Sequence, residues 1–281
     1  MNQIDNLDFV HLHVHSEYSL VDGIIKINDL VDHSVSLGYH SVALTDLTNL
    51  FGLIGFYRAA RKNGIKPIVG SEVKVAKDKD SIPAPLVLLA MNKQGYINLT
   101  KLVSRAYVEG QVDGEPIILF NWLEEFSDGL IALSGGIDGH IGNSILTGNK
   151  KLSESRAEFF KTVFNDNFFI ELQRTGKNNE KEYNDAALEL ASRTGIPVVA
   201  TNNVRFLNAV DPDVSPSDFE AHEARVCIQR GDILDDPRRP KNYTQDQFLR
   251  SKEEMIELFS DIPEALVLSL IHISEPTRPY W

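Results

Sequence analysis

The chain of 281 residues is 42% hydrophobic with a net charge of −12, so it can bury a full core but is poorly suited to gripping nucleic acid. Its single cysteine, Cys227, excludes an internal disulfide or a zinc site of paired cysteines, and fits a cytoplasmic protein. The polar N-terminus lacks the regions of a signal peptide, and no apolar run approaches the roughly 20 residues that cross a bilayer, so we expect no membrane association.

The first predicted strand, residues 9–14, begins a run in which His11, His13 and His15 alternate with apolar residues. Side chains repeat every second residue along an extended segment, so we expect the three histidines on one face. Asp22 follows closely, and imidazole and carboxylate groups are common metal ligands. The segment therefore predicts a metal site or the remains of one, although a lone histidine such as His11 is more typical of a structural position.

Short runs rich in β-branched residues alternate with longer helical patterns, as in repeated βα units around a parallel sheet. After residues 9–14, the predicted strands span residues 41–45, 67–69 continuing at 72–75, 86–90, 130–133, 168–172 and 198–200. The predicted helices span residues 27–37, 52–63, 97–106, 153–163, 181–194, 219–229 and 245–259. Gly64 and Gly195 suit the position that follows a helix C-terminus, and each leads directly into a strand.

This order of elements predicts an α/β fold, a distorted barrel of (β/α)7 type with a C-terminal extension of helical and extended segments. A doubly wound open sheet fits the same pattern. In barrels of this kind, functional groups gather at the carboxyl ends of the strands. The residues with suitable chemistry at those ends are His13, His15, Asp46, Glu72, Asn202 and Asn203.

Seven blocks in order resemble the N-terminal polymerase-and-histidinol-phosphatase (PHP) domain of the bacterial DNA polymerase III alpha-subunit family. The first block is FVHLHVHSEYSLVDG, and the seven cover residues 9–23, 43–73, 88–107, 130–136, 171–176, 197–206 and 222–244. Metal-bearing members of that family hold up to three ions through His, Asp, Glu and Cys residues on loops at one end of a barrel. The resemblance implies this fold and an ancestral metal site.

The family's ligand pattern is only partly present. The positions that match are His13, His15, Asp22 and Glu72. The other five of nine positions read Leu47, a residue at or near Pro85, Gly136, Asn203 and Arg205. Leucine, proline and glycine have no side-chain donor atom, and the charge of an arginine repels a divalent cation. We therefore expect a degenerate site with no metal or one weakly bound metal, in which Arg205 compensates the remaining acids.

The resemblance also implies a function. The intact protein would perform DNA-templated DNA synthesis with Mg²⁺ in a polymerase palm that lies outside this chain. This domain would act as a scaffold and as the dock for a proofreading exonuclease subunit, while DNA, the sliding clamp and the clamp loader would bind through missing domains. The alternative is an active metal-dependent phosphoesterase, either a 3′–5′ exonuclease or a phosphatase, which needs the ligands that are lost here.

The domain organisation follows from the change in character after the last predicted strand. We expect a PHP barrel over residues 1–207 and an extension over residues 208–266 that leads toward the palm. The stretch from Leu268 to Arg278 resembles the translation of a sequencing adapter, so residues 267–281 are expected to be a non-native tail on a truncated fragment.

Overall fold

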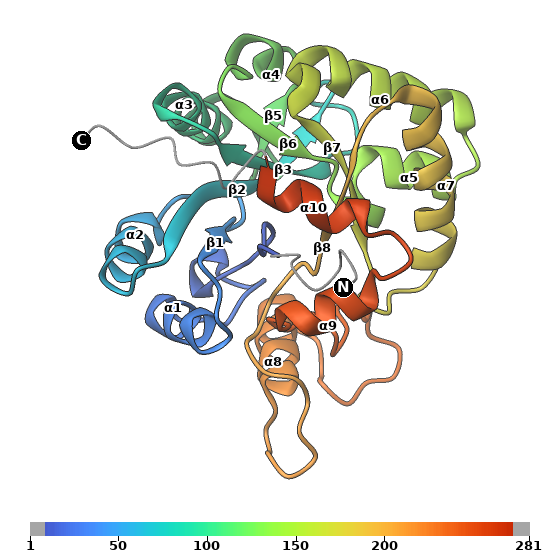
Figure 1. The fold of residues 1–281 in the computed structure, drawn as a ribbon. Helices are drawn as coiled ribbons and strands as arrows, with labels where there is room; N and C mark the ends of the chain where they lie inside the picture. Colours follow the sequence, from blue (N-terminus) through green and yellow to red (C-terminus); the bar gives the residue numbers. More distant parts are fainter. Residues whose placement is uncertain (1–8, 272–281) are drawn as a thin grey trace.

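The computed structural model describes residues 9–271, and within them eight strands form one mixed sheet surrounded by helices (Figure 1). The strands are Ser41–Leu44 (β1), Lys66–Ala76 (β2), Ala84–Ala90 (β3), Gln111–Val112 (β4), Glu115–Leu119 (β5), Leu130–Leu133 (β6), Phe168–Gln173 (β7) and Val198–Thr201 (β8). The helices are Ile27–Ser36 (α1), Leu53–Lys62 (α2), Lys93–Glu109 (α3), Phe120–Phe126 (α4), His140–Leu146 (α5), Lys150–Phe164 (α6), Glu180–Thr194 (α7), Asp218–Arg230 (α8), Lys252–Leu258 (α9) and Glu264–Ile271 (α10).

The sheet closes into a distorted barrel through the N-terminal segment, residues 9–15. The hydrogen-bonded order is β4-β5-β2-β3-β6-β7-β8, and β1 pairs with β2. On one side of the N-terminal segment, the amide of Ala43 in β1 donates to the carbonyl of His11 over 2.9 Å. On the other side, the amide of Val204, just after β8, donates to the carbonyl of His13 over 2.9 Å. The segment therefore joins β1 to the chain that follows β8, and the predicted barrel is confirmed.

The barrel interior is a layer of buried apolar side chains to which the N-terminal segment and six strands contribute. Its members are Val10, Leu12, Ala43, Ile68, Val87, Leu89, Ile131, Leu133, Phe169 and Val199. A larger apolar layer outside the barrel joins the outer strand faces to α3, α6 and α7, and a smaller one joins β1 to α1 and α2. Burial of each large apolar side chain contributes about 1.5–3 kcal/mol. The barrel wall is therefore stabilised by apolar packing on both its inner and its outer face.

One strand runs against the predicted parallel direction. β3 pairs antiparallel with both β2 and β6, whereas β1–β2, β6–β7 and β7–β8 are parallel. The expectation of a wholly parallel sheet is wrong here because residues 77–83 join β2 to β3, and a connection that short has no room for a crossover helix. The small β4–β5 pair and the short helices α4 and α5 are further elements that the sequence pattern did not predict.

The predicted helix boundaries agree well where a capping residue marks them. Gly64 and Gly195 have φ values of +76° and +66°, the left-handed conformation expected after a helix. The predicted helix over residues 245–259 is wrong at its start, since α9 begins at Lys252. There Ser251 and Glu254 form a reciprocal capping box.

The residues before α9 are extended and pack on the barrel. The amide of Arg205 donates to the carbonyl of Gln247 over 2.8 Å, and the amide of Leu249 donates to the carbonyl of Phe206 over 3.1 Å. The extension therefore lies against the chain that leaves β8. Among the described residues, no helix is long and apolar enough to span a membrane.

Candidate functional site

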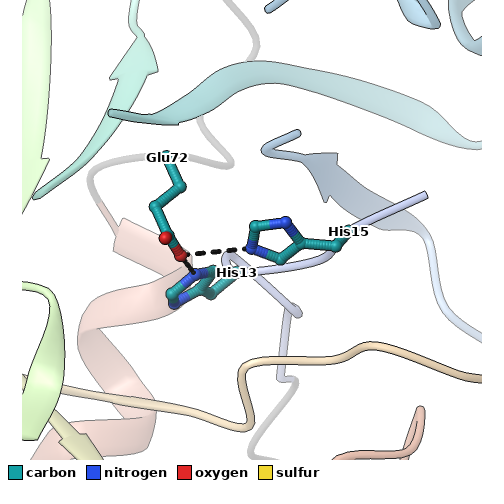
Figure 2. A group of neighbouring side chains, drawn as sticks. All are labelled: His13, His15 and Glu72. Carbon is teal, nitrogen blue, oxygen red and sulfur yellow. Dashed lines mark hydrogen bonds and ion pairs between the residues drawn. The ribbon is translucent and has the colours of Figure 1, made fainter. Parts of the chain in front are cut away.

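The mouth of the barrel brings together His13, His15 and Glu72. The two histidines come from the N-terminal segment and the glutamate from the middle of β2, and their rings and carboxylate point toward one another (Figure 2). One donor atom from each lies within 4.8 Å of the others, and all three side chains are buried. This group could hold a metal ion.

His13 lies between two carboxylates. Its Nε2 is 2.6 Å from Oε2 of Glu72, and its Nδ1 is 2.7 Å from Oε1 of Glu171 in β7. Burial by itself lowers the pKa of His13, but the charges and hydrogen bonds of Glu171 and Glu72 outweigh burial and raise this pKa to about 9. At neutral pH both ring nitrogens therefore donate, and His13 is an imidazolium.

Glu72 is the shared acceptor of the group. Besides His13, its Oε2 lies 3.2 Å from Nε2 of His15 and 3.5 Å from Nη2 of Arg205. Burial opposes ionisation of Glu72, but hydrogen bonds from the two histidines and the charge of Arg205 hold its pKa well below the ordinary value. Burial and the charge of Arg205 lower the pKa of His15 to about 4, so His15 is neutral beside its charged neighbour.

Glu171 is a site residue that the sequence reasoning missed. Its side chain is fully buried, and its Oε1 also accepts hydrogen bonds from Thr201 Oγ1 and Gln173 Nε2. Burial opposes ionisation, but the His13 charge and these donors lower the pKa of Glu171. A signal was present, because Glu171 lies near the end of a predicted strand, where functional groups were expected.

Asp22, the fourth predicted ligand, has a different set of contacts. Its Oδ1 accepts a hydrogen bond from the hydroxyl of Tyr243, and its main-chain carbonyl accepts one from Nη1 of Arg205 over 3.1 Å. The carboxylate is not part of the group formed by His13, His15 and Glu72. The structure thus brings three of the four predicted ligands together and holds the fourth against the extension.

His11 also lies apart from the cluster. Its Nε2 is 2.9 Å from the carbonyl of Arg250, and its ring packs edge-on against Phe9 and Tyr39. The expectation that all three histidines share one face is therefore wrong for His11. Leu12 faces the barrel interior and His13 turns toward Glu72 and Glu171, so strict alternation breaks between them because the segment is not a regular strand.

Arg205 occupies the place where charge compensation was expected. Its guanidinium is buried and contacts Glu72, the carbonyl of Asp22 and, through Nε at 2.9 Å, Oδ1 of Asn203. The guanidinium also lies 5.7 Å from the ring centre of Tyr243. His13 and Arg205 carry two positive charges, and Glu72 and Glu171 carry two negative ones. The four side chains together are therefore neutral.

The positions that lack donor side chains are filled by other contacts. The backbone of Leu47 pairs with that of Glu72. Gly136 has a φ of +58°, and a Cβ placed on it would lie 2.9 Å from the amide group of Gln173. The amide group of Gln173, which donates to Glu171, therefore fills the space beside Gly136.

The other polar strand-end residues have structural contacts. Asp46 accepts hydrogen bonds from the backbone and hydroxyl of Ser16 and from the hydroxyl of Ser19, while burial raises its pKa. Asn202 donates to the carbonyls of Asp246 and Phe248. These residues hold the turn after the histidines and the extension in place.

The donor set fits at most one metal ion. The contact between His13 Nδ1 and Glu171 is the kind that orients a histidine whose other nitrogen binds metal. A centre of several metals, however, needs further donors, and Leu47, Gly136 and Arg205 supply none. The described residues therefore do not fit a multi-metal hydrolytic centre, and a single ion would compete with Arg205 for Glu72.

Comparison with known proteins decides the family. The PHP domain family matches residues 11–175, which is 165 of the 281 residues. The chain belongs to the PHP domain family. A solved amidohydrolase from Chromobacterium violaceum with bound sulfate aligns with 78% of this PHP chain and 97% of its own, at a TM-score of 0.47 and 15% identity, a likeness too low to bear on activity.

Curated relatives of this PHP chain are named DNA polymerase III subunit alpha. The protein of Escherichia coli K12 is 50% identical over 260 residues, that of Pseudomonas aeruginosa 47% over 261 and that of Vibrio cholerae 47% over 264. These alignments cover 92%, 92% and 93% of this chain but 22% of each relative. The chain thus spans about a fifth of the length of the curated relatives it matches.

Proposed function

We propose that this chain is the N-terminal PHP part of a bacterial replicative DNA polymerase III alpha subunit. The observation that carries the proposal is identity of 47–50% along nine-tenths of the chain to alpha subunits of three bacteria. The proposed boundaries are 1–207 for the barrel, 208–266 for the extension toward the palm and 267–281 for a non-native tail. Of that tail, residues 272–281 lie outside the described residues.

The proposed activity of the intact protein is template-directed addition of dNTPs in the cytoplasm. Acidic residues of a palm beyond this chain would hold Mg²⁺ for nucleotidyl transfer. DNA, the sliding clamp and the clamp loader would be bound by those missing parts. The fragment by itself would synthesise no DNA.

The proposed role of this domain is a scaffold and a dock for the proofreading exonuclease subunit. The buried charge group supports that role over hydrolysis, because Arg205 lies beside Glu72 where a metal would have to bind. His13, His15, Asp22 and Glu72 would be vestigial ligands that hold no metal or one weakly bound divalent ion.

The uninterrupted gene provides the direct test of the polymerase assignment. Its full-length product should extend a primed template with dNTPs and Mg²⁺, and the 281-residue chain should not. The full-length product should also co-purify with the exonuclease subunit of the same organism. A gene without a downstream palm, or a folded full-length product that extends no primer, would overturn the assignment.

Metal-dependent phosphoester hydrolysis is the second candidate, favoured by the three donors of His13, His15 and Glu72 within reach of one ion. The test is hydrolysis of single-stranded DNA and of a phosphate monoester with added Mn²⁺ or Zn²⁺. We expect none above background. Hydrolysis that His13→Ala abolishes while the variant stays folded would reverse the order of the two candidates.

A further inference from the structure

Helix α2 exposes large apolar side chains on the rim of the barrel. Phe51, just before the helix, and Ile54, in its first turn, are 66% and 60% exposed. Tyr57 follows Ile54 by three residues and is also exposed, so Ile54 and Tyr57 share one face of the helix. In Figure 1 this helix lies at the periphery of the molecule beside α1.

The turn that follows the histidines extends the same surface. The ring of Tyr18 lies 2.9 Å from a Cβ placed on Gly52, and Asn49 donates to the carbonyl of Tyr18 over 2.9 Å. Leu20, in the same turn, is 62% exposed. Two segments far apart in sequence thus present apolar groups on the rim, which we call the α2 surface: Tyr18, Leu20, Phe51, Ile54 and Tyr57.

Helix α2 itself carries only positive charges, whereas Glu17 and Asp22 lie in the turn that contains Tyr18 and Leu20. Helix α2 contains Arg58, Arg61 and Lys62 and no acidic residue, and the three cations are exposed. Within residues 9–271, none of them forms an ion pair, whereas Arg105 and Arg193 both pair with glutamates. In a chain of net charge −12, these cations have no acidic partner within the described residues, and they can form ion pairs with carboxylates of a binding partner.

We propose that the α2 surface docks a protein segment in which acidic side chains alternate with apolar ones. The apolar side chains of the segment would cover Phe51 and Ile54, and its carboxylates would pair with Arg58, Arg61 and Lys62. Exposed apolar side chains next to complementary charge are the usual composition of such a recognition surface.

A peptide fits this surface better than single-stranded nucleic acid does. The most exposed members include the aliphatic Leu20 and Ile54, which gain from burial but offer no ring for base stacking. The chain's net charge of −12 also repels a polyanion, while a short segment with a few carboxylates brings little charge. The inference is independent of whether the chain comes from a polymerase.

The test measures binding of fluorescein-labelled synthetic peptides to the 281-residue chain by fluorescence anisotropy. The probe is a short peptide of alternating Glu and Leu or Phe, and a second peptide carries Gln in place of each Glu. Charge reversal by Arg58→Glu with Arg61→Glu should weaken binding of the acidic peptide by more than about tenfold. Loss of apolar contact by Phe51→Ser with Ile54→Ser should weaken it similarly.

The matched control reverses two exposed charges elsewhere, Lys150→Glu with Lys151→Glu at the start of α6, and should change binding less than about twofold. Thermal unfolding curves establish that every variant is folded. No binding of the acidic peptide, equal binding of the Gln peptide, or binding that survives the α2 variants would overturn the proposal. Tighter binding of a short oligothymidylate than of the acidic peptide would overturn it in favour of a nucleic-acid surface.

Discussion

The barrel interior and the barrel mouth are built from the same strands but are stabilised in opposite ways. In the interior, β6 and β7 supply Leu133 and Phe169, which need only apolar neighbours of suitable volume. At the mouth, β2 and β7 supply Glu72 and Glu171, whose burial as carboxylates needs positive charge nearby: His13 contacts both, and Arg205 contacts Glu72. Unpaired buried acids are costly, so the mouth depends on charge pairing where the interior depends on packing.

The largest effect is expected from removal of the Arg205 charge. Arg205→Ala leaves His13 as the only cation beside two buried carboxylates, and should lower the free energy of unfolding by about 3–5 kcal/mol. Arg205→Lys keeps a charge and should cost less. Urea unfolding at neutral pH measures both, and a loss below about 1 kcal/mol for the alanine variant would contradict the charge-compensated mouth.

A cavity in the interior should have a comparable but pH-independent effect. Leu133 is fully buried, and Leu133→Ala should lower the free energy of unfolding by about 3 kcal/mol through lost burial and a cavity. The same urea experiment at several pH values checks it. A strong pH dependence of this loss would show that interior and mouth are not separate.

Two buried histidines should respond to pH in opposite directions. His13 has a folded pKa raised to about 9, so its stabilisation is fully present below about pH 6.5 and is lost as pH rises through about 9, a change of up to about 3 kcal/mol. His140 packs on Phe120 and contacts the carbonyl of Val75, and burial lowers its pKa to about 4. Its contribution is therefore lost as pH falls from about 6.5 toward 4.

Stability curves of His13→Gln and His140→Gln against the parent chain separate these effects. The first substitution should flatten the loss of stability between about pH 6.5 and 9. The second should reduce the loss of stability between about pH 6.5 and 4 by the share of His140, because His11, His15 and His222 have pKa values lowered to about 4 as well. If His13→Gln leaves the loss of stability at alkaline pH unchanged, the assignment of His13 as an imidazolium between two carboxylates is wrong.

The smallest effect is expected from adding a side chain at Gly136, one of the positions where the family pattern has a ligand. Gly136→Ala forces a left-handed φ on alanine and presses its Cβ on Gln173, which should cost about 1–3 kcal/mol. Adding Gln173→Ala removes the contact but leaves the backbone strain, so part of the loss should persist. A stabilised single variant in a thermal unfolding assay would show that the position is not constrained.

The strands and the main helices could be predicted because their periodicity and capping residues are local. The antiparallel direction of β3 could not be predicted in this way. It depends on the shortness of the connection at residues 77–83, which leaves no room for a crossover helix. Within the site, His13, His15 and Glu72 could be placed from the family pattern. Glu171 and Tyr243 could not be paired with their partners, because they lie 158 and 221 residues from His13 and Asp22 in the sequence.

We propose that Arg205 takes the place of a metal ion in balancing the acids at the barrel mouth. The most direct test is elemental analysis of the chelator-treated, dialysed protein, followed by calorimetric titration with Zn²⁺ and Mn²⁺, for the parent chain and Arg205→Ala. We predict substoichiometric metal and weak binding in the parent, and tighter binding in a folded Arg205→Ala. One tightly held ion per parent chain would show that Arg205 does not take the place of a metal.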